Sequence, residues 1–227
     1  MEIIPGIHKI DGVSGANCYL VTSGAELMLS DTGMRGSSKK IESYLKALGK
    51  KPSDVKYIFL THSDMDHVGG AMEMKKLTGA KLIIHAGDVP TLAGNNSSRL
   101  RNKGRFVKIL MAILSKLIRF PRVEPDIILK ENTDIAGFKI INTPGHSDGS
   151  ISIYLPGKVI FVGDALTSDA KGNPRRPTKA LAADMTQARA SVTMIAGLEY
   201  DTLLVGHGAP VKGEASAKVK TLLTHWK

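Results

Sequence analysis

Four apolar runs of strand length each end in a side chain that can bind a metal ion. The runs are YIFLTH, KIINTPGH, VIFVGD and TLLVGH, and their last residues are His62, His146, Asp164 and His207. Because the carboxyl ends of strands in layered α/β folds meet at one edge of a sheet, we expect these four side chains to lie there together. The chain must therefore fold so that four distant segments share one edge.

The first run continues into THSDMDHVGG, residues 61–70, which adds the side chains of Asp64, Asp66 and His67. Seven donors exceed what one tetrahedral ion binds, but they suit two ions that share a bridging carboxylate and keep positions open for water and substrate. Alternate residues at a strand end point the same way, so one tight loop can serve both ions. The closing glycine pair permits close backbone approach where a β-carbon would collide.

Helical and strand-like patterns alternate along most of the chain. Helical spacing followed by a glycine marks residues 36–50 and 71–79. Two further helices are expected around residues 186–197 and 214–225. Strand-like runs in hairpin order with interspersed helices favour an α/β or α+β layered domain over an all-β barrel. The length of 227 residues suits one domain over residues 1–227.

Composition indicates the class of protein and its expected compartment. A hydrophobic fraction of 42% with 23% charged residues is typical of a globular protein and excludes intrinsic disorder. The single cysteine, Cys18, excludes an internal disulfide framework and a zinc finger with several thiolate ligands. The first ten residues lack the basic start and long apolar core of a signal peptide, so we expect a cytoplasmic protein.

Residues 97–122 differ in character from the rest of the chain. Eight basic side chains and no acidic one occur in a broad apolar helical pattern, which we interpret as an inserted helical cap. Its apolar stretch is interrupted by basic residues and falls short of the roughly 20 residues that a bilayer span needs, so we expect no membrane span. The net charge of +10 fits either an anionic partner or a solvated basic surface.

A second basic segment, KGNPRRPTK at residues 171–179, closely follows Asp164. Its position near the expected site makes Arg175 and Arg176 candidates for binding an anionic small-molecule substrate. The alternative is a solvated loop that contacts no ligand.

Taken together, the ordered motifs resemble the metallo-β-lactamase superfamily, whose signature is T-H-x-H-x-D-H-x-G-G. TPGHSDGS and VGD are similar to the second and third motifs of small glyoxalase-II-like members. The matching segments cover residues 15–90 and 127–210. The resemblance implies a four-layer αββα sandwich in which two mixed sheets are flanked by helices.

The resemblance also implies how two divalent ions would be held. It assigns to the first ion His62, Asp64 and His146, to the second ion Asp66, His67 and His207, and to the bridge between them Asp164. Asp31, in the sequence DTG, matches an aspartate that supports the site without contacting the ions.

One position departs from the family signature. Residue 64 is usually histidine and is Asp64 here. A carboxylate can still coordinate, but it adds a negative charge and a harder donor, which makes iron or manganese more competitive with zinc. We expect two divalent ions, with zinc favoured and iron or manganese as alternatives.

The expected function is hydrolysis by a metal-bridged hydroxide, with Asp66 orienting the nucleophile. Similarity to glyoxalase II suggests a thioester, a lactone or another ester as substrate. A phosphodiesterase or nuclease on the same fold is the alternative that the positive charge and Asp64 favour, although aromatic residues are not interleaved with the basic run. A di-iron redox protein is a further alternative. The sequence leaves the oligomeric state open.

Overall fold

The computed structural model describes residues 1–22, 26–93 and 123–226. The basic insertion expected at residues 97–122 lies outside these ranges. Within them, no helix is both long and apolar enough to cross a membrane.

The first sheet contains seven strands in chain order. They are β1 (Glu2–Ile4), β2 (Ile7–Lys9), β3 (Tyr19–Val21), β4 (Leu27–Ser30), β5 (Val55–Phe59), β6 (Lys81–His85) and β7 (Ile127–Leu129). Strands β1 to β4 pair antiparallel, and β4 to β7 pair parallel. The sheet is therefore mixed, and its parallel half contains the strand that leads into the THSDMDHVGG segment.

The second sheet has the strand order β14-β11-β10-β9-β8. Its strands are β8 (Thr133–Ile135), β9 (Phe138–Asn142), β10 (Ile151–Leu155), β11 (Val159–Gly163) and β14 (Thr202–Val205). All pairs are antiparallel except β11 with β14. A separate hairpin joins β12 (Thr167–Ser168) to β13 (Pro174–Arg175).

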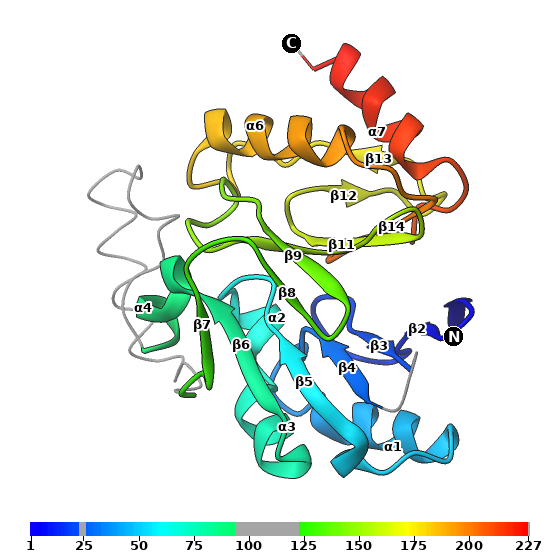
Figure 1. Ribbon diagram of the computed structural model, residues 1–227, viewed down its shortest axis with the longest axis vertical. Coiled ribbons are helices and arrows are strands. Elements are labelled where there is room, and N and C mark those ends of the chain that lie inside the picture. The colour runs from blue at the N-terminus through cyan, green and yellow to red at the C-terminus, as the bar shows by residue number, and fades with distance from the viewer. Residues whose placement is uncertain (23–25, 94–122, 227) are drawn as a thin grey trace.

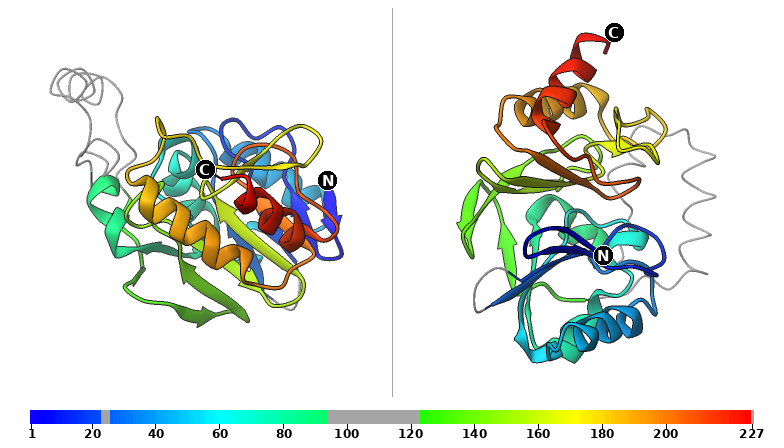
Figure 2. Two further views of the ribbon diagram at one scale, coloured as in Figure 1. Left: turned by 90° about the horizontal axis from the view of Figure 1, so that it is seen from above. Right: turned by 90° about the vertical axis from the view of Figure 1, so that its right-hand side faces the viewer.

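Helices cover the outer face of each sheet (Figures 1 and 2). The longer ones are α1 (Ser38–Ala47), α3 (Ala71–Thr78), α6 (Met185–Ala196) and α7 (Ala215–Thr224). Short helical turns are η1 (Pro52–Asp54), α2 (Met65–Val68), η2 (Ala86–Asp88) and α4 (Val89–Leu92). Helices α1 and α3 lie on the first sheet, and α6 and α7 lie on the second (Figure 1). The layers follow the expected αββα order.

Three apolar cores separate the four layers, as β11 illustrates. Ile160 and Val162 pack into the core beneath α6 and α7, whereas Val159 and Phe161 pack into the core between the sheets. Successive side chains of a strand point to opposite faces, so a strand buried on both faces needs an uninterrupted apolar run. This requirement explains why the runs in the sequence do not alternate with polar residues.

The segment that follows β5 differs in one respect from the expected tight loop. After Asp64 the chain forms the single helical turn α2 before it enters α3. A β-carbon on Gly69 would lie 2.6 Å from the Met65 carbonyl oxygen and collide with the backbone near Met34. The glycine therefore permits the close approach that the sequence suggested.

Candidate metal centre

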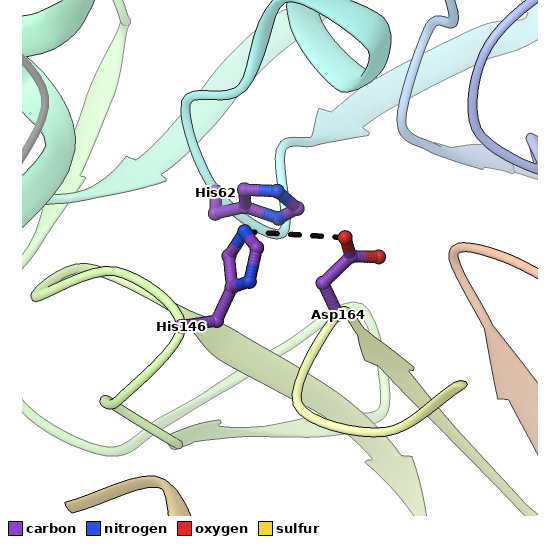
Figure 3. Close-up of side chains that lie close together, drawn as sticks. All are labelled: His62, His146 and Asp164. Atoms are coloured by element: carbon purple, nitrogen blue, oxygen red, sulfur yellow. Dashed lines mark ion pairs between the residues drawn. The ribbon is translucent and has the colours of Figure 1, made fainter. Parts of the chain in front are cut away.

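The loops after β5, β9, β11 and β14 meet where the two sheets face each other. Asp164 directly follows β11, and His207 lies two residues beyond β14. His62 lies three residues beyond β5, and His146 lies four residues beyond β9. The topology thus brings together the ends of all four apolar runs, and the three side chains drawn in Figure 3 point toward one another.

Six of the seven nominated side chains form two compact groups. One group is His62, His146 and Asp164, and the other is Asp66, His67 and His207. Within each group, one nitrogen or oxygen atom per residue lies within 4.8 Å of the others. Two such groups are the arrangement that two neighbouring ions require.

The seventh side chain, Asp64, faces the first group. Its Oδ2 atom lies 3.0 Å from Nε2 of His146 and 3.4 Å from Nε2 of His62. Asp64 precedes helix α2 but makes no side-chain capping hydrogen bond to it. Its carboxylate is therefore directed at the imidazoles and does not serve as a helix cap.

Asp164 reaches both groups. Its Oδ1 atom lies 3.4 Å from Nε2 of His67, and its Oδ2 atom lies 3.5 Å from Nε2 of His207 and 3.9 Å from Nε2 of His146. The rings of His62 and His67 are only 3.9 Å apart between centroids. The Asp164 carboxylate therefore lies within reach of imidazoles from both groups.

Several buried atoms at this centre have unused bonding capacity, which fits a bound cation. Within the described residues, Nε2 of His62, Nε2 of His67 and Oδ1 of Asp164 are buried and make no hydrogen bond. A buried polar atom without a partner costs free energy, so such atoms are rare without an ion or water. Imidazole and carboxylate donors together suit zinc, iron and manganese.

Asp31 orients two of the imidazoles. Its carboxylate accepts hydrogen bonds from the Thr61 amide and hydroxyl, both at 2.8 Å, and lies 2.9 Å from Nδ1 of His67. His67 donates from Nδ1, and in the neutral ring its Nε2 lone pair then faces Asp164. Because the Thr61 hydroxyl donates to Asp31, it accepts from Nδ1 of His62 at 3.1 Å, which leaves Nε2 of His62 free as well.

The carboxylates of the centre are strongly acidic. Burial alone would raise the pKa of Asp64, but the hydrogen bond with His146 and the proximity of His62 outweigh it and hold that pKa well below its usual range. Burial also opposes ionisation of Asp164, yet the neighbouring histidines, His67 foremost, lower its pKa strongly. Both carboxylates are therefore anionic near neutral pH.

The imidazoles respond in opposite directions. Burial would lower the pKa of His67, but the charges of Asp31 and Asp164 outweigh it and raise that pKa well above its usual value. Burial and the neighbouring His62 lower the pKa of His146. A hydrogen bond to Asp66 raises the pKa of His207.

Asp88 supports the site and was not nominated from the sequence. It is buried and accepts hydrogen bonds from the Ser63 amide at 2.7 Å, the Ser147 hydroxyl at 2.8 Å and the Gly149 amide at 3.1 Å. Ser63 and Ser147 directly follow two nominated histidines. Asp88 thus fastens together the two loops that contribute to the first group. No local spacing in the sequence signals this role, because the bonds join residues far apart.

Asn17 and Gly206 hold the loop of His207 in a similar way. The Asn17 side chain donates to the Val205 and Gly208 carbonyls, both at 2.9 Å, and the Asn17 backbone amide donates to the Gly206 carbonyl at 2.8 Å. A β-carbon on Gly206 would collide with Oδ1 of Asp164 and lie 2.6 Å from Cε1 of His67. The glycine between β14 and His207 is the signal that sequence reasoning could have used.

The two nominated arginines differ in their surroundings. Arg175 is exposed and forms an ion pair with Asp169 at 3.5 Å across the β12–β13 hairpin. Arg176 lines a groove beside α6. The two arginines, which the sequence made equal candidates, therefore differ: Arg175 forms an ion pair and Arg176 lines a groove.

Comparisons with known proteins agree with this architecture. A sequence model of the metallo-beta-lactamase superfamily matches residues 11–207. The chain is 30% identical to the probable metallo-hydrolase YflN of Bacillus subtilis (strain 168), over 94% of this chain and 88% of that protein. It is 31% identical to a hydroxyacylglutathione hydrolase of Buchnera aphidicola, over 72% of this chain and 52% of that enzyme.

Two solved structures share the fold. A metallo-beta-lactamase family protein from Thermus thermophilus superposes with a TM-score of 0.72 at 24% identity, over 99% of this chain and 80% of that one. BJP-1, a subclass B3 metallo-beta-lactamase of Bradyrhizobium japonicum, gives 0.70 at 25% identity, over 98% and 89%. The expected fold class and family are confirmed. The chain belongs to the metallo-beta-lactamase superfamily and is a metal-dependent hydrolase.

Proposed function

We propose that the protein binds two divalent metal ions through the seven nominated side chains and hydrolyses a thioester, a lactone or another small ester. The observation that supports this proposal is the pair of ligand groups joined at Asp164, with buried nitrogen and oxygen atoms that lack hydrogen bonds within the described residues. Ions held there would lower the pKa of water toward neutrality and polarise the carbonyl group under attack.

The residues of the chain have distinct roles in this proposal. Asp66 is partly exposed, lies 3.1 Å from Nε2 of His207, and would accept a hydrogen bond from the attacking water and orient it. Asp164 would fix the distance between the ions. Asp31 would keep His67 in the tautomer that presents Nε2 to the second ion.

A further observation supports a small anionic ester or thioester. The chain resembles an enzyme named for hydrolysis of hydroxyacylglutathione. Zinc is the proposed metal, and Asp64 would shift the balance toward iron or manganese relative to a histidine at that position. Phosphodiester hydrolysis remains the second candidate because the net charge of +10 suits a phosphate substrate.

The direct test is metal analysis of protein purified without added metal, followed by assays on thioester, lactone, simple ester and phosphodiester panels. We expect close to two equivalents of metal and turnover on the first three panels. His67→Ala should reduce turnover by at least about a thousandfold, because it removes a proposed metal ligand and leaves the carboxylates of Asp31 and Asp164 without the imidazole that they contact.

His225→Ala is the matched control, since His225 is exposed near the end of α7. It should leave turnover and metal content unchanged. Full activity and full metal content in His67→Ala would contradict the proposed second ion site. Turnover on the phosphodiester panel alone would replace the proposed substrate class.

A further inference from the structure

A groove of about 950 Å³ lies on the outer side of the second sheet, apart from the metal centre. Its walls come from residues 176–179, from one face of α6 and from Trp226, which follows α7. None of the seven nominated metal ligands lines it. Its volume falls in the range of sites that hold small organic ligands.

One face of α6 is turned toward this groove. Met185, Arg189 and Thr193 recur at intervals of four residues, as neighbours on one helix face do. Val192 and Ile195, on another face, are buried in the core above the second sheet. One face of α6 therefore packs on the second sheet, and Arg189 lies on a different face that lines the groove.

The charge of the groove is positive. Arg176, Lys179 and Arg189 line it, and within the described residues none of the three forms an ion pair. Arg175, the neighbour in sequence, is instead paired with Asp169. Three cations around one hollow, with no ion-pair partner in the described part of the chain, favour a ligand with more than one negative charge.

Among the residues that the structure describes, the acidic residue at the start of α6 forms no ion pair with a cation of the groove. The Asp184 carboxylate accepts hydrogen bonds from the amides of Thr186 at 2.8 Å and Gln187 at 3.0 Å, and so caps the helix. These two amides are therefore occupied, and an anion in the groove would be bound by the basic side chains.

The groove also has an apolar wall. The Trp226 side chain is only 6% exposed, Pro177 is buried and Met185 is half-buried. A flat aromatic or heterocyclic ring can stack or pack against such a wall, while phosphate groups reach the arginines. Basic side chains beside a flat apolar surface match a ligand that has both parts.

We propose that this groove binds a phosphate-bearing organic anion with a flat ring, in the chemical class of nucleoside diphosphates. The site is connected to the metal centre through the backbone. Ala183 lies in the chain between residues 176–179 and α6, which form two walls of the groove. Its amide donates to the Gly145 carbonyl at 2.9 Å and to the His146 carbonyl at 3.1 Å. Binding itself does not depend on hydrolysis at the metal centre.

Trp226 provides a direct readout because it is the only tryptophan in the chain. The experiment is a titration of the metal-loaded full chain with adenosine diphosphate, followed by tryptophan fluorescence and by calorimetry. Inorganic phosphate and adenosine are titrated separately. We expect a saturable fluorescence change with adenosine diphosphate and binding at least tenfold weaker for each fragment.

The double variant Arg176→Gln with Arg189→Gln should bind adenosine diphosphate about a hundredfold more weakly, since each charge-assisted contact contributes about a factor of ten. Arg175→Gln is the matched control and should bind within about twofold of the parent, because Arg175 is paired with Asp169. If circular dichroism shows that the double variant is unfolded, Arg189→Gln alone should still weaken binding about tenfold.

Several results would overturn the proposal. They are no saturable signal at low salt, equal binding of inorganic phosphate, unchanged binding in Arg189→Gln, and tighter binding of a single-stranded oligonucleotide than of adenosine diphosphate. Loss of binding after the metals are chelated would place the ligand at the metal centre and also contradict it. Hydrolytic activity is not used as a readout, so failure here leaves the proposed function intact.

Discussion

Asp31 shows how much one buried residue determines at this site. Its backbone has a φ of 60°, in the left-handed region that a non-glycine residue enters only at some cost. In return, its carboxylate contacts both Thr61 and His67, and through the Thr61 hydroxyl it also fixes the ring of His62. The strained backbone at Asp31 is therefore part of how the ligands are oriented.

Replacing Asp31 tests this orienting role. In Asp31→Asn, we expect zinc affinity to fall about 10- to 100-fold, because His67 loses the charged acceptor that fixes its tautomer. Competition with a chromophoric chelator measures the change. Asp134→Asn, at an exposed aspartate of β8, is the control and should leave affinity unchanged. Equal affinities for the parent and Asp31→Asn would show that the carboxylate does not tune the metal site.

The raised pKa of His67 predicts a pH dependence of metal binding. In the metal-free protein, Asp31 and Asp164 keep His67 protonated above its ordinary pKa, and an incoming ion must displace the proton on Nε2. Metal affinity should therefore rise as pH increases toward the pKa of His67, with a proton released on binding. Calorimetry in buffers of different ionisation enthalpy measures this release. Affinity that is flat between about pH 6 and 8 would contradict it.

Among individual residues, the sequence predicted the side chains at strand ends and missed those that form hydrogen bonds between loops far apart in sequence. His62, His146 and His207 were found because each follows an apolar run, and strand ends converge by topology. The roles of Asp88 and Asn17 depend on hydrogen bonds between distant loops, which no local pattern encodes. Arg175 and Arg176 could not be told apart because the ion pair of Arg175 exists only once the hairpin forms.

Among the elements, η2 has a role larger than its length suggests. It places Asp88 between the loop after β5 and the loop after β9. These loops contribute His62 and His146 to the first ligand group. The geometry of that group therefore depends on a single turn of helix that contributes no ligand itself.

Asp88→Ala tests this dependence. We expect the free energy of unfolding to fall by about 2–4 kcal/mol, because several buried donors lose their acceptor. Zinc affinity should fall as well, since the two loops lose their shared partner. Urea denaturation and chelator competition measure the two effects. Asp134→Ala, an exposed control, should change neither, and unaltered stability in Asp88→Ala would show that the loops hold their positions without it.

The long elements were predictable, and several of the short ones were not. Strands β10 and β11 bury four and five consecutive residues, and β5 and β6 bury three residues each, which leaves a clear apolar run in the sequence. Strands β1 and β2 have three residues each and were not identified, because so short a run carries little pattern. The helical turn α2 was expected as a loop, since its four residues complete only one turn.

Across the whole molecule, the ligand groups join the two sheets. His62, Asp64, Asp66 and His67 follow a strand of the first sheet, whereas His146, Asp164 and His207 follow strands of the second. Each ligand group combines residues from both sheets. Ions bound here would therefore connect the halves of the sandwich in addition to the apolar core between them.

Metal removal should lower stability for this reason. With free zinc at about 100 times its dissociation constant, the bound ions should add about 2.7 kcal/mol per site to the free energy of unfolding. Urea denaturation with zinc and with a chelator measures the difference. The three apolar cores should keep the metal-free chain folded. Identical midpoints in the two conditions would contradict binding to the folded state, and His67→Ala should show a smaller difference than the parent.

The Thr61 hydroxyl has a consequence for how such ions would load. It stands between Nδ1 of His62 and the carboxylate of Asp31, which also contacts His67, so one chain of hydrogen bonds links an imidazole of each ligand group. Polarising either ring shifts electron density along the whole chain. An ion at one position would therefore change the donor strength of the imidazole at the other, and a protein with one ion bound would differ from the average of the metal-free and fully loaded forms.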